Sequence, residues 1–183
     1  MRIKPAFLFI LLILMFQTGC LYAVRYDGPY KGKVVDKETR EPIEGAVVLG
    51  TWGVYHFSPG GGSNTFYDAK EAVTDKNGEF MIPGQGLRIL SSVGPMRVLV
   101  YKARHDYYEN NWTYIINHRY TEDEIRWEGD TPVFQLKKIT DADREKDLNG
   151  SLIPSLPYME TSRKFLMTQE INKERIYRGY DPL

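Results

Sequence analysis

The sequence predicts a mainly β protein, a sandwich of short strands followed by a helical C-terminal extension. Three observations support this fold class. Residues 30–49 contain two extended, β-branched runs separated by turn residues. Residues 72–83 contain the run Asp75–Gly78, a hairpin signal because its Asn and Gly tolerate positive φ and its Asp can hydrogen-bond the turn amides. After Ile139 the composition changes, and helix-start chemistry replaces the strand pattern.

The N-terminus is expected to be a signal sequence and not part of the fold. Arg2 and Lys4 form a positive start, and the apolar run 6–16 is too short to span a bilayer, which needs about 20 residues. The run ends in Gln-Thr-Gly-Cys, which resembles the processing site of bacterial lipoproteins, with Cys20 as the residue that receives lipid. Cys20 is the single cysteine, and acylation by chains such as palmitate accounts for a thiol that would otherwise be reactive in an exported protein. Leu21 follows it, which in lipoproteins of two-membrane bacteria usually means export to the outer membrane, facing the periplasm or the surface.

Residues 20–29 are expected to be a membrane tether, and the sandwich to follow it. Lys33–Asp36 reads as the first strand. Pro42 then fixes φ near the value that a turn needs, and Gly45 supplies a position without Cβ strain before the apolar strand Ala46–Leu49.

The stretch Thr51–Lys70 is predicted to be a long inserted loop. Its centre, residues 59–64, is rich in glycine and is not expected to hold a regular strand. Its flanks are aromatic, and long loops in compact domains are often functional. Candidate ligand-binding residues are therefore the aromatics of this loop and one further along the chain: Trp52, Tyr55, Phe57, Tyr67 and Trp112. The alternative is an extended hairpin whose aromatic side chains pack on the sandwich.

The remaining elements follow from local patterns. In chain order we expect a loop over 85–95, a central strand over 96–103, a strand around 107–116, a helix start at 121–124 and a closing strand over 131–139. Beyond these, Thr140 is predicted to cap a short helix that Gly150 closes, residues 152–157 to be a linker, and residues 159–177 to form a second helix. That helix carries an irregular apolar stripe of Phe165, Leu166, Met167, Ile171 and Ile176, which is expected to dock on the sandwich or on a partner.

The strand and turn residues resemble a known family. The patterns Gly32-x-Val34-x-Asp36, Pro42-Ile43-x-Gly45-Ala46-x-Val48 and Thr74-Asp75-x-Asn77-Gly78-x-Phe80-x-Ile82-Pro83 look like the carboxypeptidase regulatory-like domain, a transthyretin-like β-sandwich. The resemblance implies a non-catalytic accessory module. Arg40 stands where the family usually turns with Gly. The implied organisation is a lipoprotein signal peptide at 1–19, a tether at 20–29, a transthyretin-like sandwich at 30–139 and a helical extension at 140–183.

Composition excludes several classes of function. With 24 basic and 24 acidic residues the chain lacks the excess of positive charge that nucleic-acid binding requires. The three glycines at 60–62 are not followed by a Lys-Ser or Lys-Thr pair, so a phosphate loop is not expected. The three histidines, His56, His105 and His118, lack zinc spacing, and the acidic run 141–147 lacks the glycine and final glutamate of a calcium loop. No metal or cofactor is expected.

The functional expectation is a lipid-anchored envelope lipoprotein that binds or scaffolds a protein or carbohydrate and is not an enzyme. Tyr177-Arg178-Gly179-Tyr180 also resembles the Tyr-Arg-Gly-Ser ending of hydroxyisourate hydrolases, which share the transthyretin-like fold. A hydrolase is therefore one alternative, although its N-terminal His-containing motif is absent. A purely structural lipoprotein without a ligand is another.

Overall fold

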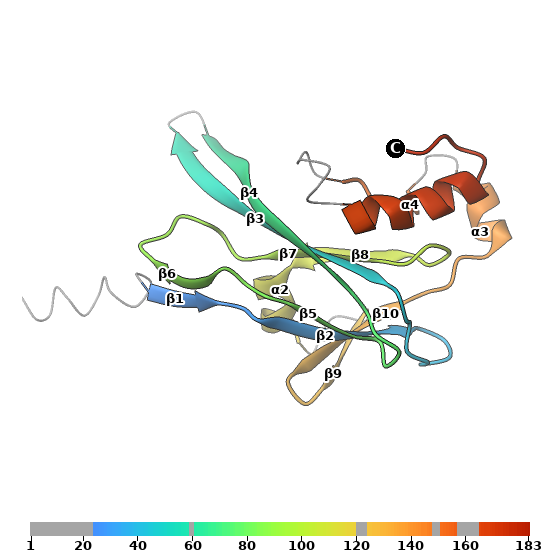
Figure 1. Cartoon of the computed structure of the whole chain (residues 1–183), viewed down its shortest axis with the longest axis horizontal. Helices are drawn as coiled ribbons and strands as arrows, with labels where there is room; N and C mark the ends of the chain where they lie inside the picture. Colours follow the sequence, from blue (N-terminus) through green and yellow to red (C-terminus); the bar gives the residue numbers. More distant parts are fainter. Residues whose placement is uncertain (1–23, 59–60, 120–123, 148–150, 157–164) are drawn as a thin grey trace, which may run out of the picture.

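The computed structural model describes residues 24–58, 61–119, 124–147, 151–156 and 165–183. The fold is mainly β, with two four-stranded sheets, a two-stranded ribbon and a C-terminal helix (Figure 1). One sheet has the order β5 (Glu79–Ile82), β2 (Tyr30–Asp36), β10 (Thr131–Leu136), β9 (Ile125–Glu128). The other has the order β4 (Gly61–Val73), β3 (Val47–Ser58), β7 (Arg97–Tyr101), β8 (Tyr107–Asn111). The ribbon pairs β1 (Val24–Asp27) with β6 (Gly86–Ile89).

The two four-stranded sheets pack face to face as a β-sandwich. Val34 and Phe134 of one sheet lie in the same apolar cluster as Val48 and Val98 of the other, and all four are fully buried. At the centre, the Phe134 ring lies 5.8 Å from that of Phe80 and 5.3 Å from that of Tyr108. Burial of such aromatic side chains dominates core energetics. The predicted fold class, a β-sandwich with a C-terminal helical extension, is confirmed.

Glycine is required at the inner face of β2. A Cβ at Gly32 would lie 2.6 Å from the ring of Phe80 and 2.9 Å from the ring of Phe134. Any side chain here would push the two rings apart, so the first residue of the Gly-x-Val-x-Asp pattern is explained by core packing.

The predicted turn chemistry is present, but it connects the two sheets instead of closing a hairpin. Asp75 accepts hydrogen bonds from the amides of Asn77 and Glu79, both at 2.9 Å, and Gly78 has φ of 75°. The strands on either side, β4 and β5, belong to different sheets. Arg40 has φ of 67°, the conformation that glycine would adopt more easily.

The inserted stretch is a strand pair, so the extended-hairpin alternative is the one that the structure shows, and the prediction that the glycine-rich centre holds no strand is wrong for residues 61–64. β3 and β4 pair from Val47 and Val73 to Ser58 and Gly61, and Figure 1 shows their far end projecting from the sandwich. A Cβ at Gly62 would overlap the Tyr55 hydroxyl, which means that the Tyr55 side chain lies across the glycine backbone. Cross-strand cover of this kind lets a glycine-rich segment stay in a strand.

Three further predictions need correction. The expected tether, residues 20–29, enters the fold at Val24 as β1, and the expected loop 85–95 contains its partner β6. The strand expected around 107–116 ends earlier, at Asn111, as β8. The Asn111 side chain accepts a hydrogen bond from the Thr113 amide at 2.9 Å and so caps the start of the helix α2 (Trp112–Asn117). The helix start expected at 121–124 lies largely outside the described residues. The strands expected over 96–103 and 131–139 are confirmed as β7 and β10.

The described part of the C-terminal extension contains the helices α3 and α4. Thr140 caps α3 (Asp141–Lys146) as predicted, through a capping box with Asp143, but the helix ends at its C-cap, Asp147, and not at the predicted Gly150. Helix α4 (Phe165–Tyr177) lies against the outer face of the β3–β7 sheet, opposite the sandwich core (Figure 1). Its buried Met167 and Ile171 pack on Leu49 and Leu99, so docking on the sandwich is confirmed. No helix in the described part of the chain is long and apolar enough to cross a membrane.

Candidate functional site

The far half of the β3–β4 pair forms a two-stranded arm beyond the sandwich. β7 pairs with β3 only as far as Thr51. A single bridge then joins Val54 to Val93, and from Tyr55 onward the described pairing of β3 is with β4 alone. Among the arm side chains that the structure describes, three aromatic ones are exposed: Tyr55 at 50 %, Phe66 at 42 % and Tyr67 at 44 %. We call this set the arm aromatics.

The register places two arm aromatics on one face. Tyr55 lies opposite Asn64 and Phe66 lies opposite Gly53, so the period of two brings Tyr55 and Phe66 to the same side. The other side carries Val54, which packs against the core, and polar residues beyond it, where a ring nitrogen of His56 lies 3.0 Å from the Thr65 hydroxyl. The arm therefore presents an aromatic face and a polar face.

Tyr67 connects the arm to the β1–β6 ribbon. It has no register partner, because the pairing shifts by one residue between Trp52 and Gly53, so Tyr67 is the extra residue of a β-bulge. Its hydroxyl accepts a hydrogen bond from Arg88 at 3.1 Å, and the Arg88 guanidinium lies 4.9 Å from the ring centre. The bulge thus turns this ring toward β6.

The structure separates the predicted ligand-binding residues into different groups. Tyr55 and Tyr67 are exposed on the arm, as a ligand-binding role requires. Trp52 is 2 % exposed and donates from its indole to Asp27 at 3.0 Å, so the expectation that it contacts a ligand is wrong. Trp112 is half-buried with its ring 5.0 Å from that of Tyr30, and it also belongs to the core. The Phe57 side chain and all of Cys20 lie outside what the structure describes.

Sequence reasoning missed the exposed residues of the ribbon. Tyr26 and Leu87 were expected in a tether and in a loop, yet they lie opposite each other on paired strands. A signal was present, since apolar and charged residues alternate in Val24–Asp27 and again in Leu87–Ile89. Both runs are only about four residues long, which is short for a strand prediction.

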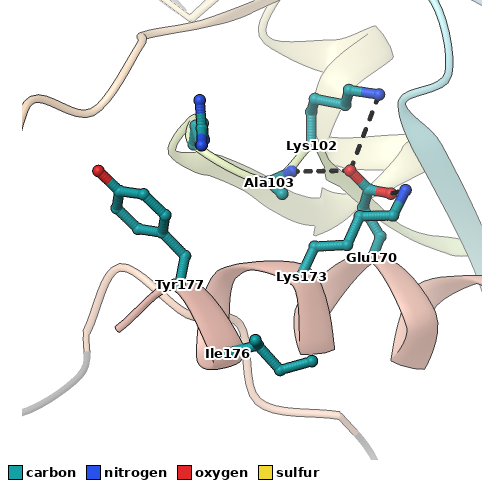
Figure 2. A pocket seen from close by; sticks show the side chains of 7 residues that line it. Lys102, Ala103, Glu170, Lys173, Ile176 and Tyr177 are labelled. Carbon is teal, nitrogen blue, oxygen red and sulfur yellow. Dashed lines mark hydrogen bonds and ion pairs between the residues drawn. The ribbon is translucent and has the colours of Figure 1, made fainter. Parts of the chain in front are cut away.

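A concave region lies between α4 and the turn from β7 to β8. It has a volume of about 450 Å³, and Figure 2 shows Lys102, Ala103, Glu170, Lys173 and Tyr177 around it. Glu170 accepts from the Ala103 amide at 3.0 Å, lies 3.8 Å from the Lys102 ammonium and pairs with Lys173. This carboxylate is buried and satisfied, and it fastens the helix to the turn.

The neighbouring charges under α4 are also paired. Glu174 accepts from the Arg144 guanidinium at 2.7 Å, from Arg178 at 2.9 Å and from the Arg104 amide at 3.0 Å. Burial opposes the ionisation of Glu174, but these hydrogen bonds outweigh it and hold the pKa of its carboxyl below the usual value. Arg178 also donates to Asp147 at 2.9 Å.

This network bears on the hydrolase alternative. That chemistry requires Arg178 and a histidine to face one pocket, whereas the two described contacts of Arg178 are with the carboxylates Asp147 and Glu174. His105 lies instead beside Asp36, at 3.8 Å. Among the described residues no group of three or more His, Cys, Asp or Glu side chains is placed to hold a metal ion.

Comparison with known proteins adds no relative. No family model, curated protein or solved structure matches the chain.

Proposed function

We propose that this protein is a lipid-anchored lipoprotein of the bacterial cell envelope whose β-sandwich is a non-catalytic binding or scaffolding module for protein or carbohydrate. The observation that carries the proposal is the aromatic face of the arm. Tyr55 and Phe66 are exposed on one side of a strand pair that extends past the sheet it starts from. Exposed aromatic side chains that do not pack in a hydrophobic core are characteristic of recognition surfaces.

The chemistry of the arm aromatics suits such a role. Aromatic rings bury a large area, stack on sugar rings or apolar side chains, and in tyrosine carry a hydroxyl that can hydrogen-bond. Two of the arm aromatics are held in place before a partner arrives: Tyr55 lies across Gly62, and Tyr67 is bonded to Arg88. Preorganised side chains lose less entropy on binding.

The anchor is proposed from the N-terminal sequence. The positive start, the apolar run and the single cysteine at position 20 together match lipoprotein processing. Acyl chains contribute about 0.8 kcal/mol per buried CH₂, so two or more chains on one residue give stable attachment. The proposed sandwich family is the carboxypeptidase regulatory-like domain, supported by the Gly32 packing and by the positive φ at Arg40 and Gly78.

The binding role is tested with the double variant Tyr55→Ala/Phe66→Ala. Truncating central interface aromatics commonly costs about 2 kcal/mol or more, so we expect capture of the partner to fall by more than about tenfold. The measurement is crosslinking in intact envelopes followed by mass spectrometry, together with binding to purified cell-wall glycans.

Tyr180→Ala is the matched control, because this tyrosine is 47 % exposed but lies at the C-terminus, outside the arm. The proposal is contradicted if the same partners are captured equally well with the arm aromatics removed.

The anchor is tested separately with Cys20→Ser. We expect the variant to lose incorporation of labelled palmitate and to leave the membrane fraction, because the thioether to lipid can no longer form. Retention of label in the variant would rule out Cys20 as the attachment site.

A further inference from the structure

The β1–β6 ribbon turns its apolar side chains toward solvent and its charged side chains toward the protein, the reverse of the other strands. Val24, Tyr26, Leu87 and Ile89 are 53 %, 73 %, 60 % and 60 % exposed. The residues that alternate with them, Arg25, Asp27 and Arg88, are half-buried or buried. A strand pair packed on a core normally turns its apolar side chains inward.

The register shows that the exposed side chains form one continuous face. Val24 lies opposite Ile89, and Tyr26 lies opposite Leu87, so all four side chains point to the same side. We call this set the ribbon face. Leu90, 84 % exposed, directly follows Ile89 and adds to the apolar surface at this end of the ribbon.

The opposite face is fastened to the protein by polar groups. Arg25 donates to the carbonyl of Val93, and Arg88 donates to the hydroxyl of Tyr67. Asp27 accepts from Tyr30 at 2.6 Å, from Trp52 at 3.0 Å and from the Gln85 amide at 2.8 Å. These contacts fix which way the ribbon faces, so the ribbon face cannot turn inward without breaking them.

The position of the ribbon in the chain points to what covers this face. Val24 is the fourth residue after Cys20, and a chain extends at most about 3.6 Å per residue, so the ribbon starts within about 14 Å of an acyl chain attached at Cys20. The polar headgroup layer on one side of a bilayer is only about 5–8 Å thick, so a ribbon tethered at this distance can reach its boundary with the acyl chains. Tyrosine is also enriched where apolar and aqueous phases meet.

We propose that the ribbon face rests in the headgroup–acyl boundary of the bilayer and is a second point of membrane contact beside the lipid anchor. The inference rests on the proposed anchoring at Cys20. Apolar faces that lie in this boundary enter it by about 5–10 Å. The covalent anchor and the ribbon contact together fix the orientation of the sandwich on the membrane surface, which a single flexible tether would not do.

The test uses the full-length protein, purified from bacterial membranes and reconstituted into vesicles of phosphatidylethanolamine and phosphatidylglycerol. An environment-sensitive thiol probe is placed at Ile89→Cys, with Met81→Cys as the matched control, because Met81 is similarly exposed at 55 % but lies on β5. We expect a blue shift of the probe at position 89 and loss of its emission with lipids brominated near the glycerol backbone, and neither change at position 81.

A second variant shows whether the face itself is responsible. Leu87→Glu places a charge beside the probe at position 89, and because Leu87 is exposed the fold is expected to persist. The blue shift should then be lost while the protein stays on the vesicles through its acyl chains.

The outcomes separate the two proposals. The mass of the N-terminal peptide reports whether Cys20 is acylated, and an unacylated cysteine overturns the anchor and the inference together. Acylated protein whose probe at position 89 behaves like that at position 81 overturns the inference alone. Shielding of position 89 that appears only when envelope proteins are added assigns the ribbon face to a protein partner and also overturns it.

Discussion

Asp27 joins three parts of the chain through one buried carboxylate. It accepts from the hydroxyl of Tyr30, the indole of Trp52 and the amide of Gln85. Burial and the nearby Asp27 both raise the pKa of Tyr30 above its ordinary value, so its hydroxyl stays a donor over the working pH range. The residue therefore holds the start of the ribbon against the core.

Asp27→Asn is expected to lower the free energy of unfolding by about 1–3 kcal/mol, the cost of leaving a buried donor without an acceptor. The amide keeps one acceptor oxygen but turns an NH₂ group toward donors. The measurement is urea unfolding followed by tryptophan fluorescence, with the exposed Asp181→Asn as the control. An equal effect of the two changes would show that Asp27 has no special role.

The same carboxylate explains why one predicted site residue was wrong. An aromatic residue in a glycine-rich insertion suggests a ligand contact, and Tyr55 and Tyr67 lie as that interpretation requires. Trp52 differs because its ring packs in the core and its indole donates to Asp27, which is distant in the sequence and lies in a stretch expected to be a tether. Local patterns cannot show such a pairing, because it exists only once β1 has packed.

At the scale of elements, α4 is attached to the sandwich at both ends. Glu71 of β4 accepts from the amides of Leu166 at 2.9 Å and Met167 at 2.7 Å, which caps the first turn of the helix. Glu170 and Glu174 accept from the amides of Ala103 and Arg104 further along. Apolar packing between these contacts completes the attachment.

Met167→Ala is expected to destabilise the protein by about 2–5 kcal/mol, because it leaves a cavity under the helix. Ile176→Ala is the matched control and should change stability by no more than about 0.5 kcal/mol, since Ile176 is largely exposed. Thermal unfolding of the two variants measures the difference. Equal shifts would mean that Met167 does not anchor α4 on the outer face of the β3–β7 sheet.

The helix also shows what sequence reasoning can and cannot reach. Caps and turns are local, so Thr140 and the Asp75–Gly78 turn could be predicted from the residues themselves. The docking face of α4 could not be predicted in this way. Glu170 and Glu174 are buried and accept hydrogen bonds from backbone amides of a distant turn, whereas Ile176, part of the predicted apolar stripe, stays exposed. The strand through the glycines of the arm was missed for a related reason, since it depends on cover from Tyr55 across the strand pair.

For the molecule as a whole, buried and bonded carboxyls set the response to pH. Burial opposes the ionisation of Asp147, but hydrogen bonds from Ser151 and Arg178 hold the pKa of this carboxyl below the usual value, as those from Arg144 and Arg178 do for Glu174. Groups with a lowered pKa stabilise the fold above their unfolded pKa of about 4, and this contribution is lost as the pH falls below it. Asp106 acts in the opposite sense, because burial raises its pKa to about 6.

Stability is therefore expected to fall steeply below a pH of about 4. Between about 4 and 6 the Asp106 contribution runs the other way, since its protonated form is the one that the fold favours, and Asp106→Asn should remove that part of the profile. Urea unfolding at intervals from pH 3 to pH 7, on the parent and this variant, provides the measurement. A profile that is flat at acid pH would contradict the role given to the network under α4.

The parallel pairing of β2 with β10 has a consequence for how the chain is made. Lys33 lies beside Val133, so a strand near the beginning of the sandwich can pair only after a strand near its end has been made. Contacts between such distant segments form late and slow the folding of β proteins. A newly synthesised chain that lacks β10 leaves β2 with only β5 beside it, so this sheet cannot be completed until nearly the whole sandwich has been made.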